Sequence, residues 1–168
     1  MLSIKNIVFA RIDERLLHGQ VVTAWVASSG CNVIYIIDDS LARNVMMVGL
    51  YNKLAPRGTS CHLLSTAKAV ELLLTEPNDE KEKIMLLAKT PQVLENLVEA
   101  GVYLKSINLG GMALNKEREV FIENVSASPE EIASMARMVG EGIPIIYQVS
   151  PHSRPVDVKV VLKRKKLR

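Results

Sequence analysis

Short apolar runs alternate with helix-like patterns along most of the chain, and this alternation limits the fold more than any other feature. The runs expected to form strands are residues 4–10, 33–37, 60–64, 84–88, 106–109, 119–122 and 143–149. Between these runs, apolar residues recur at helical spacing. Strands that are joined through helices become parallel neighbours in one sheet. The sequence therefore predicts an α/β fold with three layers, in which an open twisted sheet, mostly parallel, carries helices on both faces.

Polar residues and prolines mark where the expected helices begin. The start signals are Asp39 or Ser40 for a helix ending at Ala55, Ser65 or Thr66 for residues 67–74, Thr90-Pro91 for a helix ending before Gly101, and Ser128-Pro129-Glu130-Glu131 for a helix ending at Gly140. An earlier helix is expected over residues 19–28, with a stop at Gly30. Beyond Pro155 we expect a short basic helix.

The chain has 168 residues and is expected to form a single domain over residues 1–168, with a short basic C-terminal tail. Aromatic residues make up only 4% of the sequence, so the core must be aliphatic. The N-terminus carries no basic region followed by an apolar leader, and no apolar stretch approaches the ~18 residues of a membrane span. We therefore expect a cytoplasmic protein.

The composition gives little support to a metal or disulfide protein. Cys31 and Cys61 are the only cysteines, and both stand in apolar strand contexts that favour buried, reduced thiols. Cys61 and His62 are adjacent, so on a strand they would point to opposite faces. No metal-ligand spacing and no Gly-x-Ser-x-Gly motif occurs, and we expect neither a metal nor a cofactor.

The formal net charge of +3 is modest, and much of the excess comes from residues 163–168. A basic tail can bind nucleic acid or an anionic membrane surface. A solvated, frayed chain end is the more common case, and we expect it for these residues. Accordingly, no nucleic-acid partner is expected.

A dense cluster of charges follows the first expected strand. Arg11, Asp13, Glu14, Arg15 and His18 fall within eight residues, where a strand hands over to a helix. In an open α/β sheet, ligands bind at the carboxyl ends of the strands. The plain alternative is a set of surface ion pairs, worth ~0–1 kcal/mol each.

This cluster suits phosphoryl chemistry. A neutral imidazole such as that of His18 has a free lone pair that can attack phosphorus, and Gly19 leaves room for a reacting group. Transfer then needs mainly positioning and positive charge, which Arg11 and Arg15 can supply. Asp13 could orient the loop or hold the other ring nitrogen. His62 and His152 lack such neighbours and are expected to be structural.

Two glycines follow a later strand and offer a second possible part of the site. The backbone N–H groups of Gly110 and Gly111 could face an anion, although a simple tight turn is at least as common. The residues alone therefore leave a rival open. In that rival, the chain is a non-catalytic α/β module that binds a nucleotide or a phosphorylated metabolite at this turn.

Three stretches carry a resemblance to a known family. They are residues 11–21, Leu54-Ala55-Pro56-Arg57-Gly58, and residues 105–113, and the likeness continues into the helix after Ser128. Together they resemble the IIB components of the mannose/fructose/sorbose family of the bacterial phosphoenolpyruvate-dependent sugar phosphotransferase system. The resemblance covers nearly the whole chain, and it implies an antiparallel strand at one edge of the sheet.

The resemblance implies a phosphotransferase. His18 would receive a phosphoryl group from a phosphohistidine of the IIA component, carry it on the Nδ1 side of the ring, and pass it to a sugar held by the membrane components IIC and IID. Arg11, Asp13 and Arg15 match positions that shape the loop and neutralise the phosphate. The remaining phosphate-binding candidates, beside the same site or at strand ends on that side, are Gly19, Asp38, Ser65, Asn108, Gly110 and Gly111.

The resemblance also implies where the protein works. It would be cytoplasmic and peripherally associated with the membrane permease. Whether it forms a homo-oligomer is left open. The chain departs from the family pattern at Arg57, at residues 87–90 and at residues 150–155 with the basic tail. These departures concern the sugar and the partners, whereas the segment around His18 is intact.

Overall fold

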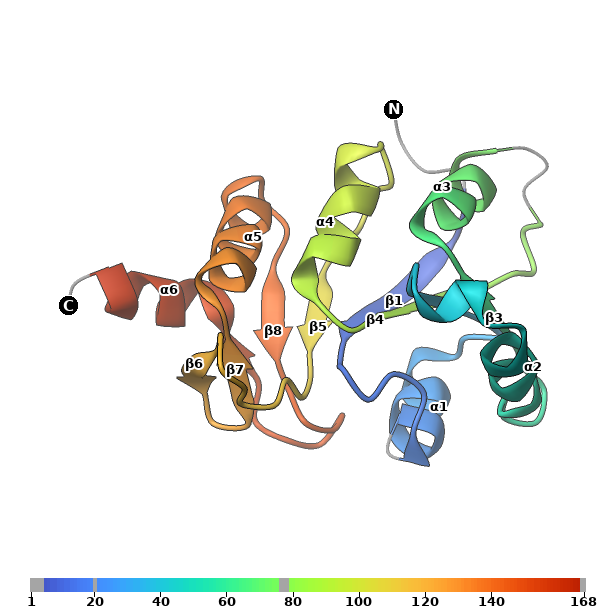
Figure 1. The fold of residues 1–168 in the computed structure, drawn as a ribbon, viewed down its shortest axis with the longest axis horizontal. Helices are drawn as coiled ribbons and strands as arrows, with labels where there is room; N and C mark the ends of the chain where they lie inside the picture. The colour runs from blue at the N-terminus through green and yellow to red at the C-terminus, as the bar shows by residue number, and fades with distance from the viewer. Residues whose placement is uncertain (1–4, 20, 76–78, 167–168) are drawn as a thin grey trace.

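A seven-stranded sheet forms the centre of the molecule, in the order β3-β2-β4-β1-β5-β8-β9 (Figure 1). The computed structural model describes residues 5–19, 21–75 and 79–166. The sheet strands are β1 (Ile7–Ile12), β2 (Val33–Ile37), β3 (Ser60–Leu64), β4 (Ile84–Ala88), β5 (Ile107–Leu109), β8 (Ile145–Tyr147) and β9 (Val156–Asp157). All neighbours are parallel except β9, which runs antiparallel to β8 at the edge. The predicted mostly parallel sheet with an antiparallel edge strand is confirmed.

Helices cover both faces of the sheet, which confirms the three-layer prediction (Figure 1). The helical segments are η1 (Val21–Trp25), α1 (Val26–Ser29), η2 (Leu41–Arg43), α2 (Val45–Lys53), α3 (Thr66–Leu74), α4 (Pro91–Glu99), α5 (Pro129–Gly140) and α6 (Val158–Lys166). Residues of α3, α4, α5 and α6 share one hydrophobic core with one face of the sheet. Residues of η1, α1 and α2 pack on the opposite face, in a second core.

The first strand differs from its prediction in a way that matters for the site. It was expected over residues 4–10, of which residue 4 lies outside the described residues, but β1 runs from Ile7 to Ile12. Arg11 is therefore part of a central strand, opposite Leu87 of β4 and Asn108 of β5. A charged side chain is tolerated there because it forms an ion pair with buried Asp13, 3.0 Å away.

The helix after β2 begins later than predicted. Residues 41–43 form the short 3₁₀-helix η2, whose Leu41 N–H donates to the Asp38 side chain. The longer helix α2 starts only after Asn44, whose side chain accepts from the Met47 N–H. The expected cap at Asp39 or Ser40 is therefore wrong for α2. By contrast, Ser65 caps α3, and Ser128 with Glu131 forms a complete capping box on α5.

The predicted strand over residues 119–122 is present, but its partner strand was not predicted. Residues 119–122 form β6, which pairs with β7 (Val125–Ala127) in a separate antiparallel hairpin. Residues 163–166 are not a frayed end but continue α6, whose Val158 and Leu162 pack into the core; residues 167–168 lie outside the described residues. None of the helices in the described ranges is long and apolar enough to cross a membrane.

The two cysteines are buried and free, as predicted. Burial raises the pKa of the Cys61 thiol to about 12, and it also raises the pKa of Cys31. Both side chains belong to the core on the α1 and α2 side of the sheet. They are structural residues in this fold.

Candidate active site

Asp13, one residue beyond β1, is the centre of the site. Its Oδ2 accepts hydrogen bonds from Arg11 Nη2 at 3.0 Å and from Arg15 Nη2 at 2.8 Å. Its Oδ1 accepts from the backbone N–H and from Nε of Arg15, each at 3.0 Å. His18 Nε2 lies 3.3 Å from Oδ2, the oxygen that both arginines contact. Three residues singled out from the sequence, Arg11, Arg15 and His18, thus converge on the carboxylate of a fourth, Asp13.

The surroundings of Asp13 keep its carboxylate charged. Burial alone would raise the pKa of this carboxyl group. The hydrogen bonds from Arg15 and the positive charges of Arg11 and Arg15 outweigh burial and hold the pKa well below its usual value. Asp13 is therefore ionised at neutral pH, where it can accept hydrogen bonds but cannot donate them.

Arg11 supports Asp13 from the interior of the protein. Its side chain is fully buried, and besides Asp13 it donates to the Asn108 side chain and to the backbone carbonyl of Gln148. Burial lowers the pKa of its guanidinium, and the Asp13 carboxylate opposes that shift. Asn108 is 7% exposed, and its side-chain oxygen is committed to Arg11. The structure therefore places Arg11 and Asn108 behind the carboxylate.

A tight turn brings His18 back onto Asp13. The Leu16 N–H donates to the Asp13 carbonyl at 2.9 Å, and Leu16 has a left-handed backbone with φ 55°. That conformation is costly for a branched side chain. It is offset because Leu16 and Leu17 are buried in the core on the α1 side. Arg15, in contrast, stays 52% exposed, so it is the cation that the site offers to solvent.

The two nitrogens of the His18 ring have different surroundings. Nε2 faces Asp13, and since an ionised carboxylate only accepts, Nε2 carries the proton in the neutral ring. Nδ1 is then the nitrogen with the free lone pair. The side chain is 19% exposed, so a reacting group can reach it. This arrangement has the form of an oriented nucleophile whose ring is held by a carboxylate.

Gly110 allows the ends of β1 and β5 to approach one another. A Cβ at Gly110 would lie 2.6 Å from Asp13 Oδ2 and even closer to Arg11 Nη2, so any larger residue would disturb the site. The Gly110 N–H donates to the Ile12 carbonyl at 2.7 Å. It therefore completes the sheet and does not face an anion, which corrects the interpretation of Gly110 as an anion-binding N–H. A Cβ at Gly111 would lie 3.3 Å from Arg15 Nη2.

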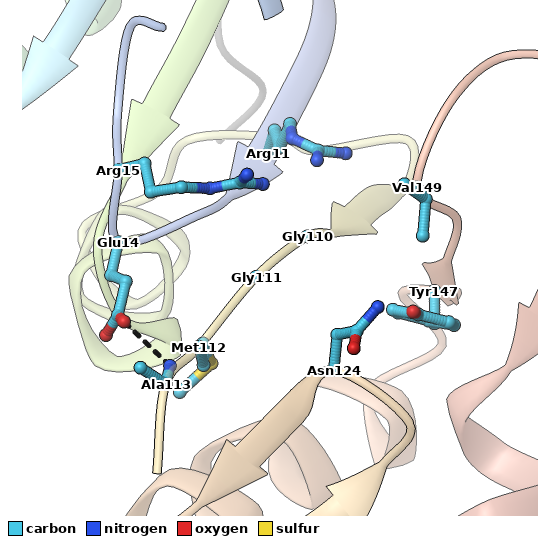
Figure 2. Close-up of a pocket in the computed structure, with 10 residues that line it drawn as sticks. All are labelled: Arg11, Glu14, Arg15, Gly110, Gly111, Met112, Ala113, Asn124, Tyr147 and Val149. Carbon is cyan, nitrogen blue, oxygen red and sulfur yellow. Dashed lines mark hydrogen bonds between the residues drawn. The ribbon is translucent and has the colours of Figure 1, made fainter. Parts of the chain in front are cut away.

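A pocket of about 260 Å³ opens beside this carboxylate (Figure 2). Its lining residues are Arg11, Glu14, Arg15, Gly110, Gly111, Met112, Ala113, Asn124, Tyr147 and Val149. Figure 2 shows Arg15 reaching along one wall, while Asn124 and Tyr147 form the opposite wall. Neither His18 nor Asp13 is among the lining residues, although Asp13 contacts Arg11 and Arg15, which are.

Arg118 fixes the outer side of the loop and could not be found from the sequence. Glu14 accepts from the Ala113 N–H at 2.7 Å and from Arg118 Nη1 at 2.7 Å (Figure 2 for the first contact). Arg118 Nη2 also donates to Glu131 at 2.8 Å, and Glu131 belongs to the capping box of α5. Arg118 is 104 positions away from Glu14, and no local motif marks it.

The structure does not bring Asp38 and Ser65 to this group of residues. They follow β2 and β3, which lie two and three strands away from β1. Asp38 accepts from the Leu41 N–H of η2 and lies 3.6 Å from Lys89, and Ser65 caps α3. Gly19 stands next to His18, and nothing lies within 4 Å of a Cβ built on it. Among the residues that the structure describes, no three His, Cys, Asp or Glu side chains gather to hold a metal ion.

Comparisons of the sequence with known proteins all indicate the same family. Residues 7–168 match the family described as "PTS system sorbose subfamily IIB component". The chain is 29% identical to the fructose-specific EIIB component of Bacillus subtilis (strain 168), over 94% of this chain and 96% of that protein. It is 34% identical to the mannose-specific EIIAB component of Escherichia coli (strain K12), over 80% of this chain but only 41% of the longer protein.

Solved structures agree with the sequence comparisons. The crystal structure of the IIBSor domain of the sorbose permease from Klebsiella pneumoniae superposes with a TM-score of 0.88 at 27% identity, covering 95% of this chain and 97% of that domain. A second structure, manxB from Thermoanaerobacter tengcongensis, has a TM-score of 0.86 at 29% identity, over 96% and 98% of the two chains. The chain therefore belongs to the sorbose subfamily of IIB components of the phosphoenolpyruvate-dependent sugar phosphotransferase system.

Proposed function

We propose that this IIB component carries a phosphoryl group on Nδ1 of His18, between a IIA phosphohistidine and a sugar. The observation that supports this most directly is the contact of 3.3 Å between His18 Nε2 and the buried carboxylate of Asp13. With Nε2 held in this way, the lone pair of the neutral ring lies on Nδ1. The phosphorylated nitrogen would be the one that the carboxylate leaves free.

Two in-line transfers make up the proposed reaction. In the first, the Nδ1 lone pair attacks phosphorus, and the P–N bond to the donor histidine breaks with its electron pair left on the donor nitrogen. In the second, a sugar hydroxyl attacks, the P–Nδ1 bond breaks, and the hydroxyl proton is released to solvent or to the ring. Because Asp13 is ionised, it stabilises the positive ring that forms on attack.

The two arginines would have different duties. Arg15 is 52% exposed and contacts Asp13 through only one edge of its guanidinium, so it can also neutralise the oxygens of the transferring phosphoryl group. Arg11 is fully buried and would act through Asp13, by keeping the carboxylate in place and charged. Asn108 in turn positions Arg11.

The alternative of a non-catalytic nucleotide or phosphometabolite module has less support. It needs free N–H groups at the glycine turn, but the Gly110 N–H is occupied by the Ile12 carbonyl. It also treats His18 as a bystander, although the ring lies on the same carboxylate oxygen as Arg11 and Arg15.

The proposed partners are a IIA component as donor and the membrane components IIC and IID, which would hold the sugar. The mannose-specific relative from Escherichia coli is named as an EIIAB component, and this chain spans 41% of it. We therefore propose that the IIA function comes from a separate chain or domain, and that the protein works at the cytoplasmic side of the permease. Relatives are named for mannose, fructose, sorbose and N-acetylgalactosamine, so no single sugar is assigned.

Intact mass spectrometry tests the proposal. The full chain is incubated with phosphoenolpyruvate, the upstream carriers and IIA, and we expect the gain of one acid-labile phosphate. His18→Gln should abolish this gain. His62→Gln is the matched control and should be phosphorylated normally. His62 is exposed on β3, where its side chain contacts Ser60 and the edge of the Tyr35 ring. A phosphate gain that survives His18→Gln would refute the assignment.

A further inference from the structure

The C-terminal helix α6 presents a basic face that the phosphotransfer reaction does not use. Val158 and Leu162 turn one side of α6 into the core. Helical geometry places Lys159, Val160, Lys163 and Arg164 on the opposite side, and all four are exposed. We call these four residues the α6 basic face. Val160, at its centre, is 45% exposed.

Positive charge is concentrated on this helix. The nine residues of α6 include five cations and no carboxylate, whereas the whole chain has a formal net charge of only +3. The rest of the chain is therefore net negative. Within the described parts of the chain, none of the five cations forms an ion pair. The repulsion among these like charges is therefore not offset by an ion pair within the described residues.

A groove with a volume of about 610 Å³ runs along the same helix. Arg154, Arg164 and Lys165 line it together with apolar residues of β6 and β9, and Glu123 and Asp157 also border it. Lys165 Nζ lies 5.3 Å from the centroid of the Phe121 ring, which keeps its charge at the groove. Beside this groove, Val120 of β6 is 62% exposed.

The mixture of cations with aliphatic side chains distinguishes between possible anionic partners. Single-stranded nucleic acid is bound through exposed aromatic rings on which bases stack. The aromatic ring of this region, Phe121, is only 6% exposed and lies beneath Lys165. An anionic membrane surface attracts clustered Lys and Arg side chains, and exposed apolar side chains beside them can enter the headgroup layer. Val160 and Val120 are exposed apolar side chains of this kind, so the region fits a membrane surface better than single-stranded nucleic acid.

We propose that the α6 basic face binds the anionic headgroups of a phospholipid bilayer. Lys159, Lys163 and Arg164 would contact lipid phosphates, and Val160 would enter the headgroup layer. The face lies at the β9 end of the sheet, whereas His18 follows the central strand β1 (Figure 1). Membrane contact would therefore leave the catalytic loop free for its protein partners. The proposal does not depend on phosphorylation of His18.

Sedimentation with phospholipid vesicles tests the inference on the full chain. The vesicles contain phosphatidylcholine alone or phosphatidylcholine with about 30 mol% phosphatidylglycerol. We expect binding to the anionic vesicles only, with an affinity that falls as salt is raised. Each basic residue near such a surface contributes a factor of about five, so Lys159→Gln, Lys163→Gln and Arg164→Gln combined should weaken binding about 100-fold.

A second triple variant provides the matched control. Lys53→Gln, Arg57→Gln and Lys105→Gln remove the same charge from exposed positions outside α6 and should change binding only a few-fold. Val160→Ser should weaken vesicle binding while leaving its salt dependence unchanged. Thermal unfolding verifies that each variant is folded.

Four outcomes would overturn the proposal. They are no binding to anionic vesicles at low salt, equal binding to neutral vesicles, and equal losses in the two triple variants. The fourth is α6-dependent binding of a DNA or RNA oligonucleotide with no vesicle binding, which would assign the basic face to nucleic acid instead.

Discussion

At the scale of single residues, Asp13 determines what its neighbours can do. It orients the His18 ring through Nε2, it holds Arg15 through two hydrogen bonds from the side chain, and it balances the buried charge of Arg11. The sequence predicted that these four residues form one cluster, because they stand within eight positions of one another. It could not show that Arg11 lies behind the carboxylate and Arg15 in front, since that depends on where β1 ends.

The first prediction concerns Asp13→Asn. This change keeps the side-chain shape but leaves the buried Arg11 cation without its counter-charge. In the proposed reaction, it also removes the negative charge that would stabilise the attacking ring. We expect phosphorylation of His18 to slow by a factor of about 100. We also expect the free energy of unfolding, measured by urea titration at neutral pH, to fall by about 3 kcal/mol.

The pH dependence of unfolding provides a check on the same variant. Asp13 has a pKa below its usual value in the folded protein. Its stabilising contribution is therefore complete above the unfolded pKa of ~3.9 and is lost as pH falls further toward the folded pKa. The difference in unfolding free energy between wild type and Asp13→Asn should shrink as pH is lowered from about 5 to about 2. A constant difference would contradict the role given to this carboxylate.

At the scale of secondary-structure elements, sequence patterns succeeded where a strand is apolar throughout. The bounds of β2 and β4 are those predicted, because each is an uninterrupted apolar run. The bounds of β3 are also those predicted, although its buried Cys61 and Leu63 alternate with exposed Ser60 and His62. The short strands β7 and β9 were not predicted, since two or three residues carry no periodic signal. The prediction ended the first strand too early, because Arg11 breaks the apolar pattern. Only the tertiary partners of Arg11 make this residue compatible with a strand.

The close approach of β1 and β5 leads to the second prediction. In Gly110→Ala, the new methyl group would lie 2.6 Å from Asp13 Oδ2, so the Asp13 and Arg11 side chains or the chain at Gly110 must shift. We expect a loss of about 2 kcal/mol in the free energy of unfolding, together with slower phosphorylation of His18.

Gly49→Ala in α2 is the control for this glycine. Nothing lies within 4 Å of a Cβ at Gly49, and alanine favours a helix. That variant should therefore gain about 0.5–1 kcal/mol. If Gly110→Ala and Gly49→Ala gained stability by the same amount, crowding would not explain why position 110 is a glycine.

At the scale of the whole molecule, one side chain joins the loop after β1 to the helical layer. Arg118 is 8% exposed. Its guanidinium donates hydrogen bonds simultaneously to Glu14 of the loop, to the Ala113 carbonyl after β5, and to Glu131 at the start of α5. These three segments are far apart in the sequence, which is why no local pattern identifies the link. The pocket wall and the loop are thereby fixed to the rigid α5 helix.

The third prediction tests this link with two substitutions of Arg118. Arg118→Gln leaves two carboxylates without a cation, so we expect a loss of about 3 kcal/mol in the free energy of unfolding and phosphorylation about tenfold slower. Arg118→Lys keeps the charge, but one ammonium group cannot reach Glu14 and Glu131 with the geometry of a guanidinium. It should therefore recover much of the stability and little of the rate.

Arg137→Gln provides the comparison, because Arg137 also pairs with a carboxylate, Glu95, but is 58% exposed and lies on α5 away from the loop. Its loss should cost less stability than the loss of Arg118, since solvent screens an exposed pair, and it should leave the phosphorylation rate unchanged. A rate in Arg118→Lys equal to that of wild type would show that the link supplies charge alone. A slow Arg118→Lys with near-normal stability would show that the two-sided guanidinium contact positions the loop for transfer.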